Sequence, residues 1–141
     1  MITRRNRPVR FTLLLVLLVL GVIACQPEDL GFDVNDLPDG DATRGAQIFT
    51  ESINGTPACA SCHAISGSEK SGPSLDDFGA VAAERVNDQD AETYTFYSIL
   101  RPAKHIVRSY SNVMPSDYAD KLSRQDIADL IAYLMSLHSE R

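Results

Sequence analysis

The sequence predicts an all-α fold, and three observations lead to this prediction. Apolar side chains recur at helical spacing in three stretches: residues 41–52, residues 91–101 and the region after Ser123. No stretch alternates apolar and polar residues well enough to predict a strand. The 141 residues, 44% of them hydrophobic, suit one small domain and leave no room for two full domains or a large barrel.

Residues 1–24 are typical of an export signal. Four arginines and no acid precede an apolar run from Phe11 to Ala24, and this order of charge and hydrophobicity is that of a signal peptide. As a helix the run would be about 21 Å long, short of the roughly 30 Å of a bilayer's hydrocarbon core. A single membrane-spanning anchor is therefore the less favoured alternative.

The end of this run, Val22-Ile23-Ala24-Cys25, resembles the lipobox of bacterial lipoproteins, in which the cysteine is acylated and becomes the first residue of the mature chain. The resemblance implies a lipoprotein signal peptide over residues 1–24 and a lipid on Cys25. The mature chain would then be exported and lipid-anchored to a membrane, on its periplasmic or another extracytoplasmic side. The alternative is a cysteine that happens to end an ordinary signal peptide.

The residues between this cysteine and the predicted domain are acidic. Residues 26–40 contain five acids, no base, two prolines and two glycines, a composition that disfavours a helix. We therefore expect residues 25–40 to form a flexible tether, which would reach about 50 Å when fully extended. Residues 41–141 form the predicted domain.

The first predicted helix covers residues 41–52. Its buried face would carry Ala42, Gly45, Ala46 and Phe49. A glycine inside a helix costs roughly 1 kcal/mol relative to alanine. Gly45 therefore indicates a close approach between this helix and another one.

Two further helices have recognisable ends. The helix over residues 91–101 would be capped by Asp90 and stopped by Pro102. The last helix would be capped by Ser123, with Asp126 at the capping-box position. Its apolar stripe follows helical spacing and consists of Ile127, Leu130, Ile131 and Leu134.

Between the first two helices lies the pentapeptide Cys59-Ala60-Ser61-Cys62-His63. C-x-x-C-H is the attachment signature of c-type haem. Two cysteines one helical turn apart can each add to a vinyl group, and the adjacent histidine can offer an imidazole nitrogen to the iron. One alternative is a zinc site, which would need four ligands although no second pair of this kind is present. The other is a thioredoxin-like dithiol, which would need a βαβ context.

Around this motif the sequence resembles small monohaem class I c-type cytochromes over residues 41–138. The pieces that carry the resemblance follow the family's order: Gly45 and Phe49, the C-x-x-C-H motif, Gly72-Pro73-Ser74-Leu75, Ser98-Ile99-Leu100-Arg101-Pro102, Tyr110-Ser111-Asn112-Val113-Met114-Pro115, and Tyr133-Leu134. The resemblance implies a cytochrome c fold of three to five helices, with long loops wrapped around one covalently attached haem c. The central part is similar to the cytochrome domains of bacterial respiratory chains.

The resemblance also implies roles for individual residues. Cys59 and Cys62 would bind the haem. His63 would be the proximal iron ligand and Met114 the distal one. The carbonyl of Pro73 would accept a hydrogen bond from Nδ1 of His63, which fixes the orientation of the ring.

Other residues of the resemblance have structural or open roles. Gly45, Phe49 and Tyr133 would form the contact between the first and last helices. His105 lies on the stretch that approaches Met114 and is an alternative distal ligand. Placement at the surface or beside a haem propionate is the favoured interpretation for His105.

A haem iron with both axial positions occupied by protein has no open position for a substrate. The resemblance therefore implies a membrane-tethered one-electron carrier, not an enzyme, that shuttles electrons between respiratory or photosynthetic redox proteins. The alternative is a haem sensor or peroxidase-type enzyme whose distal ligand leaves. Nucleic acid is excluded as a partner, because a chain with net charge −6 is a poor ligand for phosphates.

Overall fold

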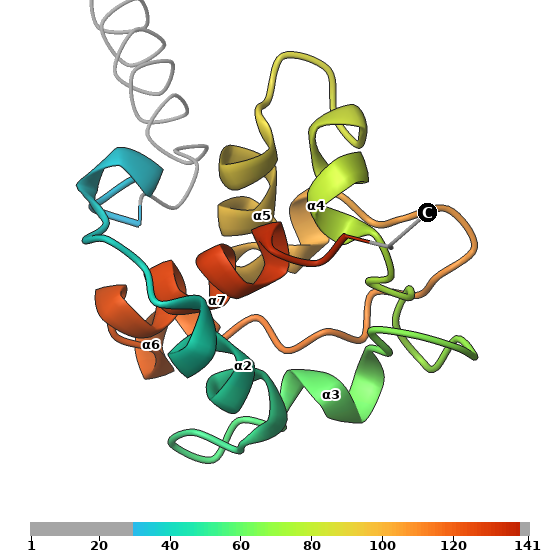
Figure 1. Cartoon of the computed structure of the whole chain (residues 1–141), viewed down its shortest axis with the longest axis horizontal. Coiled ribbons are helices and arrows are strands. Elements are labelled where there is room, and N and C mark those ends of the chain that lie inside the picture. The colour runs from blue at the N-terminus through green and yellow to red at the C-terminus, as the bar shows by residue number, and fades with distance from the viewer. Residues whose placement is uncertain (1–29, 139–141) are drawn as a thin grey trace, which may run out of the picture. The chain divides into compact units, whose positions relative to one another are not determined.

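The computed structural model describes residues 30–138 (Figure 1). The predicted signal peptide and Cys25 lie outside these residues, as do residues 139–141. Within residues 30–138 there is no strand, and the α-helices are α2 (Ala42–Thr50), α3 (Cys59–Cys62), α4 (Phe78–Val81), α5 (Ala91–Leu100), α6 (Tyr118–Lys121) and α7 (Arg124–Met135). The same range contains the 3-10 helices η2 (Val34–Asp36), η3 (Ala82–Glu84) and η4 (Pro102–Lys104). The predicted all-α fold is confirmed.

The described residues contain six α-helices, one more than the upper end of the three to five expected. Three of them, α3, α4 and α6, have four residues each, which is too short to produce an apolar period in the sequence. The longer helices α2, α5 and α7 are the ones that periodicity predicts. α2 begins one residue later and ends two residues earlier than predicted, α5 begins as predicted and ends one residue earlier, and α7 begins directly after its predicted cap. None of the helices within residues 30–138 has the length and hydrophobicity needed to cross a membrane.

The predicted helix caps are present. Asp90 accepts a hydrogen bond from the backbone N–H of Thr93, at 2.7 Å, and begins α5. At the start of α7, Oγ of Ser123 accepts from the N–H of Asp126, at 3.1 Å, and the Asp126 carboxylate accepts from the N–H of Ser123, at 3.0 Å. These reciprocal bonds satisfy two N–H groups that a helix start leaves without intrahelical partners.

α2 and α7 form the most extensive contact between helices in the described part of the chain. A Cβ atom on Gly45 would lie 2.7 Å from Cβ of Tyr133 and would overlap the backbone carbonyl of Asp129. The rings of Phe49 and Tyr133 meet at a centroid distance of 5.5 Å with an interplanar angle of 59°. The predicted contact of Gly45, Phe49 and Tyr133 is therefore confirmed, because the backbones approach too closely for a side chain at Gly45.

A buried carboxylate adds a polar link between the same two helices. Asp129 is 0% exposed. It accepts hydrogen bonds from the N–H of Asp41, at 2.8 Å, from Nε2 of Gln125, at 2.9 Å, and from the guanidinium of Arg44. Arg44 also donates to Asp126, at 2.6 Å. Since a buried carboxylate is costly unless its oxygens are paired, this network fixes how α2 sits on α7.

α7 is the element on which most of the domain packs. It contacts α2, α4 and α5. Its residues Ile127 and Leu130 are 0% and 2% exposed, and Phe96 of α5 is 0% exposed. Gly79 of α4 lies against the end of α7, where a Cβ atom would come within 2.9 Å of the backbone of Met135. The core therefore lies around α7, and Leu130 and Leu134 of this helix also border the functional site described below.

The structure differs from the predicted tether over residues 33–40. The compact unit begins at Asp33, and a capping box made by acidic side chains starts η2 there. Gln125 of α7 donates a hydrogen bond to the carbonyl of Asp39, at 2.8 Å. The acidic composition did not reveal these bonds, because they depend on short-range caps and on contact with a helix distant in sequence. A tether stays a prediction for residues 25–32.

Candidate functional site

A large pocket opens between α3, α5, α7 and the loop that leads from η4 to α6, drawn orange in Figure 1. Its empty space is about 1230 Å³, a volume that includes the solvent in its open mouth. The residues predicted to hold a haem all line this pocket: Cys59, Cys62, His63, Pro73 and Met114. The structure thus brings together residues that are up to 55 positions apart in the chain.

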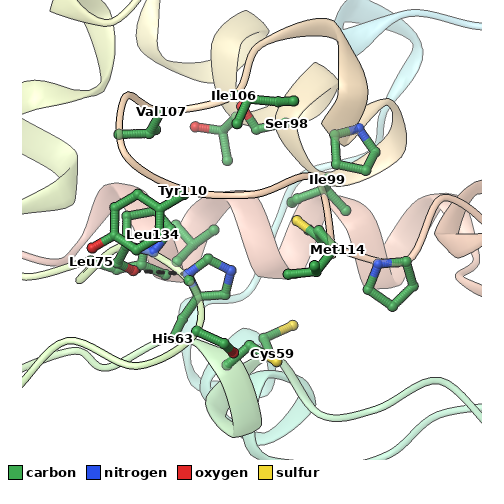
Figure 2. Close-up of a pocket in the computed structure, with 18 of the residues that line it drawn as sticks. Cys59, His63, Leu75, Ser98, Ile99, Ile106, Val107, Tyr110, Met114 and Leu134 are labelled. Atoms are coloured by element: carbon green, nitrogen blue, oxygen red, sulfur yellow. Dashed lines mark hydrogen bonds between the residues drawn. The ribbon is translucent and has the colours of Figure 1, made fainter.

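α3 places the two thiols and the imidazole on one wall of the pocket. The helix is a single turn from Cys59 to Cys62, and the N–H of His63 closes it by bonding to the carbonyl of Cys59, at 2.9 Å. The backbone of His63 is extended, with φ −113° and ψ 135°, and its side chain turns into the pocket (Figure 2). No disulfide joins Cys59 and Cys62. Both sulfurs are therefore available for bonds to a cofactor.

The two thiols differ in environment. Burial raises the pKa of Cys59. The pKa of Cys62 is lowered, first by a hydrogen bond from Ser71 and then by one from Ser61. Tyr118, on α6, donates a hydrogen bond at 3.1 Å to the carbonyl of Pro57 and so holds the residues that precede α3.

A short strap, residues 72–75, orients the imidazole of His63. Nδ1 of His63 lies 2.9 Å from the carbonyl oxygen of Pro73, as drawn in Figure 2. The strap is held alongside α3 because Gly72 N–H bonds to the carbonyl of Cys62, at 2.9 Å, and Leu75 N–H bonds to the carbonyl of Ala64, at 2.7 Å. A carbonyl can only accept, so Nδ1 carries the proton and Nε2 keeps its lone pair for a metal.

Met114 enters the same pocket from the loop between η4 and α6. Figure 2 shows its side chain and the ring of His63 bordering one shared space. The loop is shaped by short-range bonds: Tyr110 N–H donates to the carbonyl of Val107, at 3.1 Å, and Val113 N–H donates to the carbonyl of Ser111, at 2.9 Å. An imidazole and a thioether on facing parts of one pocket are a ligand pair that suits haem iron.

His105 also lines this pocket, but its ring has neighbours of its own. It meets the ring of Tyr94 edge-on, at a centroid distance of 5.7 Å. It also borders a second, smaller cavity, which Tyr94, Tyr97 and Lys104 line as well. Lys104 Nζ lies 3.7 Å from the centroid of the Tyr97 ring.

Two polar residues that sequence reasoning missed line the pocket. Oη of Tyr110 is buried without a hydrogen-bond partner among residues 30–138, and desolvation, together with nearby Glu69, raises its pKa. Arg85, a half-buried residue, also lines the pocket and forms no ion pair with the residues described. Tyr110 begins the stretch of residues 110–115 that carries part of the resemblance, but nothing in that stretch marks its hydroxyl as a pocket group. No local motif marks Arg85, because its position depends on how η3 folds over the pocket.

The donor set fits haem c better than the two alternatives. Two free thiols can form thioethers, an imidazole and a thioether can bind the iron, and an unpartnered guanidinium and hydroxyl can meet carboxylates. A zinc site has little support, because residues 30–138 contain no group of three or more His, Cys, Asp or Glu side chains that could hold a metal ion. A thioredoxin-like dithiol lacks its βαβ unit, since the same residues form no strand.

Comparison with known proteins agrees with this geometry. Residues 42–138 match the family model described as cytochrome c. No curated protein matches the chain. The matched residues extend from α2 to the end of α7 and include the whole pocket. Because the match spans well over half of its length, the chain belongs to the cytochrome c family and binds haem c covalently.

Proposed function

We propose that this cytochrome is a membrane-tethered one-electron carrier with histidine and methionine as axial ligands. Cys59 and Cys62 form the thioether bonds, His63 is the proximal ligand and Met114 the distal one. The protein shuttles electrons between redox partners of a respiratory or photosynthetic chain. The observation that carries this proposal is that all four side chains border a single pocket, with the imidazole held by Pro73.

The residues around the proximal ligand set its geometry and its basicity. The carbonyl of Pro73 accepts a hydrogen bond from Nδ1–H of His63, so the ring cannot turn freely and Nε2 stays a good donor to iron. Gly72 lies against the face of the ring, where a Cβ atom would come within 2.7 Å of Cε1. The strap therefore defines both the plane and the tautomer of this ligand.

The distal side and the apolar walls favour the reduced state. The bound haem supplies one-electron redox chemistry. The thioether of Met114 stabilises ferrous over ferric iron. Buried Leu75, Ile99, Leu130 and Leu134 keep water away from the pocket and disfavour an additional positive charge inside it. A packed protein that moves little between oxidation states suits outer-sphere electron transfer, and no side chain has to act as nucleophile or base.

Absorption spectra with carbon monoxide test the ligation. We expect the reduced protein to show a sharp low-spin spectrum that carbon monoxide leaves unchanged at neutral pH. Met114→Ala opens the distal position and should bind carbon monoxide, whereas His105→Ala, the matched control, should not. Ready binding by the unchanged protein would contradict the carrier and support a sensor or peroxidase-type enzyme. Binding created by His105→Ala alone would make His105 the distal ligand.

Cell fractionation tests the anchor, which rests on the sequence around Cys25. The mature protein is expected to carry the mass of an acyl group and to sediment with membranes. Cys25→Ser should lose that mass and release the cytochrome into the soluble fraction. If the variant stays in the membrane fraction, the apolar N-terminal run is a spanning anchor instead.

A further inference from the structure

The second, smaller cavity adjoins the haem pocket. Tyr94, Ser98 and His105 belong to the walls of both spaces. The smaller cavity has about 380 Å³ of empty space, a volume that includes the solvent at its opening, whereas a water molecule takes about 30 Å³ of the liquid. It can therefore hold an ion of several heavy atoms together with water, next to the space that the haem occupies.

The wall of this cavity is rich in hydrogen-bond donors. All but one of its lining residues carry a polar side chain, and these are Gln89, Tyr94, Tyr97, Ser98, Lys104 and His105. The side chains of Gln89, Tyr97 and Ser98 form no hydrogen bond with residues 30–138, and Lys104 and His105 form no ion pair with them. The donors are therefore available to a ligand.

The charge of the wall is positive, although the domain is acidic. Residues 33–138 contain 16 acidic and eight basic side chains, but the cavity is lined by Lys104 and His105 and by no Asp or Glu. Asp88 and Asp90 flank Gln89 in the chain without lining the cavity, and the Asp90 carboxylate is used at the start of α5. This choice of side chains favours an anion over a cation or an apolar ligand.

Ring contacts fix the two basic groups in place. Lys104 Nζ lies 3.7 Å from the centroid of the Tyr97 ring, a contact that positions the ammonium group and leaves its charge available. The ring of His105 meets that of Tyr94 edge-on, at a centroid distance of 5.7 Å. Because both groups are positioned before a ligand arrives, binding costs less side-chain entropy.

We infer that the second cavity binds a small oxyanion of the phosphate class through Lys104 and His105, and that the bound anion lowers the reduction potential of the haem. Ammonium, amide and hydroxyl groups can all donate to phosphate oxygens. A negative charge beside the haem pocket stabilises ferric over ferrous iron. The effect on the potential rests on the proposed electron-carrier function, whereas binding of the anion does not.

Binding and oxidation state are coupled in both directions. If the anion favours the ferric protein, the ferric protein binds the anion more tightly by the same factor. We expect the Kd for phosphate to be roughly threefold lower in the ferric state, because the added charge acts across one layer of side chains. A tenfold ratio corresponds to about 59 mV for a one-electron couple, so saturating phosphate should lower the potential by about 28 mV.

Titration of the holoprotein with inorganic phosphate tests the inference, with chloride holding the ionic strength constant. In the ferrous state, the NMR resonances of the Gln89 side-chain amide should shift and saturate, and a redox titration should show the lower potential. Lys104→Gln should weaken binding roughly tenfold, because it removes a charge-assisted hydrogen bond. Gln89→Leu, on a different part of the wall, should weaken it roughly threefold.

A parallel titration with glycerol 3-phosphate identifies the source of the phosphate group. A Kd lower than that of inorganic phosphate assigns the cavity to an organic phosphate. An equal or higher Kd assigns it to the free ion. Either result supports an oxyanion site, provided that binding saturates and depends on Lys104.

Arg108→Gln is the matched control. Arg108 is exposed, lies four residues beyond Lys104 and lines neither cavity. Its substitution removes the same charge and should change the Kd for phosphate by less than about twofold, because exposed charges outside the site are screened. Equal weakening by Lys104→Gln and Arg108→Gln overturns the inference, as does phosphate binding that does not saturate or leaves the potential unchanged. A spectrum that responds to carbon monoxide in the same samples shows instead that the electron-carrier function has failed, whether or not phosphate binds.

Discussion

The Cα atom of Gly72 lies against the imidazole face of His63, so that an added Cβ atom would come within 2.7 Å of Cε1 and 2.9 Å of Nδ1. Such contacts are shorter than van der Waals distance, and the backbone of Gly72 cannot retreat because its N–H bonds to the carbonyl of Cys62. The ring and the strap are therefore matched in shape. This contact lies on the face of the ring, in addition to the Pro73 bond at its edge.

Gly72→Ala should tilt the His63 ring and weaken its bond to iron. The expected result is an altered low-spin spectrum and a higher reduction potential, because stretching the bond from Nδ1 to Pro73 makes the imidazole a weaker donor and so disfavours ferric iron. Absorption spectroscopy and a redox titration measure both effects. Gly67→Ala is the control, because a Cβ atom there would meet nothing within 4 Å, although its φ of +82° adds some backbone strain. If the two variants have the same potential, the ring does not depend on Gly72.

Gly45→Ala should destabilise the domain by about 3 kcal/mol or more, because overpacking costs about 1–3 kcal/mol even where side chains can yield and here the obstacle is the backbone of α7. Urea unfolding followed by circular dichroism measures the loss. Ala46→Gly, on the same helix, gives the scale of helix propensity alone, about 1 kcal/mol. A loss at Gly45→Ala no larger than this would mean that α2 and α7 can move apart.

The stability of the fold should fall in acid through Asp126. Burial alone would raise the pKa of Asp126, but hydrogen bonds from Ser123 and the charge of Arg44 outweigh it and hold the pKa below its usual value. The carboxylate therefore contributes stability above the ordinary aspartate pKa of about 3.9, and this contribution is lost as pH falls through the lower folded value. Asp126→Asn should be less stable at pH 7 by about 1 kcal/mol.

Urea unfolding at several pH values between 2 and 7 measures this difference. The gap between the unchanged protein and Asp126→Asn should close at the acidic end, where both side chains are neutral. Asp120→Asn, an exposed acid for which no ion pair is formed within residues 30–138, is the control. A gap that stays constant over the whole range would show that charge on Asp126 does not contribute.

Arg85 is expected to influence the haem electrostatically. This half-buried residue lines the pocket, and a positive charge near the iron stabilises the reduced state. Arg85→Gln should lower the reduction potential by tens of millivolts, the size expected of a unit charge at pocket distances. Redox titration of Lys121→Gln, which removes a charge outside the pocket, provides the comparison. Equal potentials in all three proteins would place Arg85 outside the haem's electrostatic environment.

The sequence predicts those parts of the molecule whose local structure is determined by residues close together in the chain. The Cys59–His63 motif lies on one helical turn, and the caps at Asp90 and Ser123 bond to N–H groups three residues away. Helices α2, α5 and α7 are long enough for their apolar residues to show a period. These features need no knowledge of distant contacts.

What the sequence does not predict depends on contacts between distant segments. α4 follows Asp77, whose φ of 55° is left-handed, and a single turn of this kind leaves no periodic signal. Residues 33–40 look like a tether by composition but are held by Gln125, 86 positions from its partner Asp39. Arg85 reaches the haem pocket only through the folding of η3, which leaves no local pattern in the sequence.

If a lipid on Cys25 anchors the chain, the residue at which the compact unit begins limits the distance between the cytochrome and the membrane. The tether would then consist of residues 25–32, since residues from Asp33 onward belong to the domain. Eight residues span at most about 26–29 Å, which is roughly half the maximum length of a tether that continued to residue 40. The haem would then stay within a thin layer above the lipid headgroups. Its redox partners would have to present their sites of electron transfer within that layer.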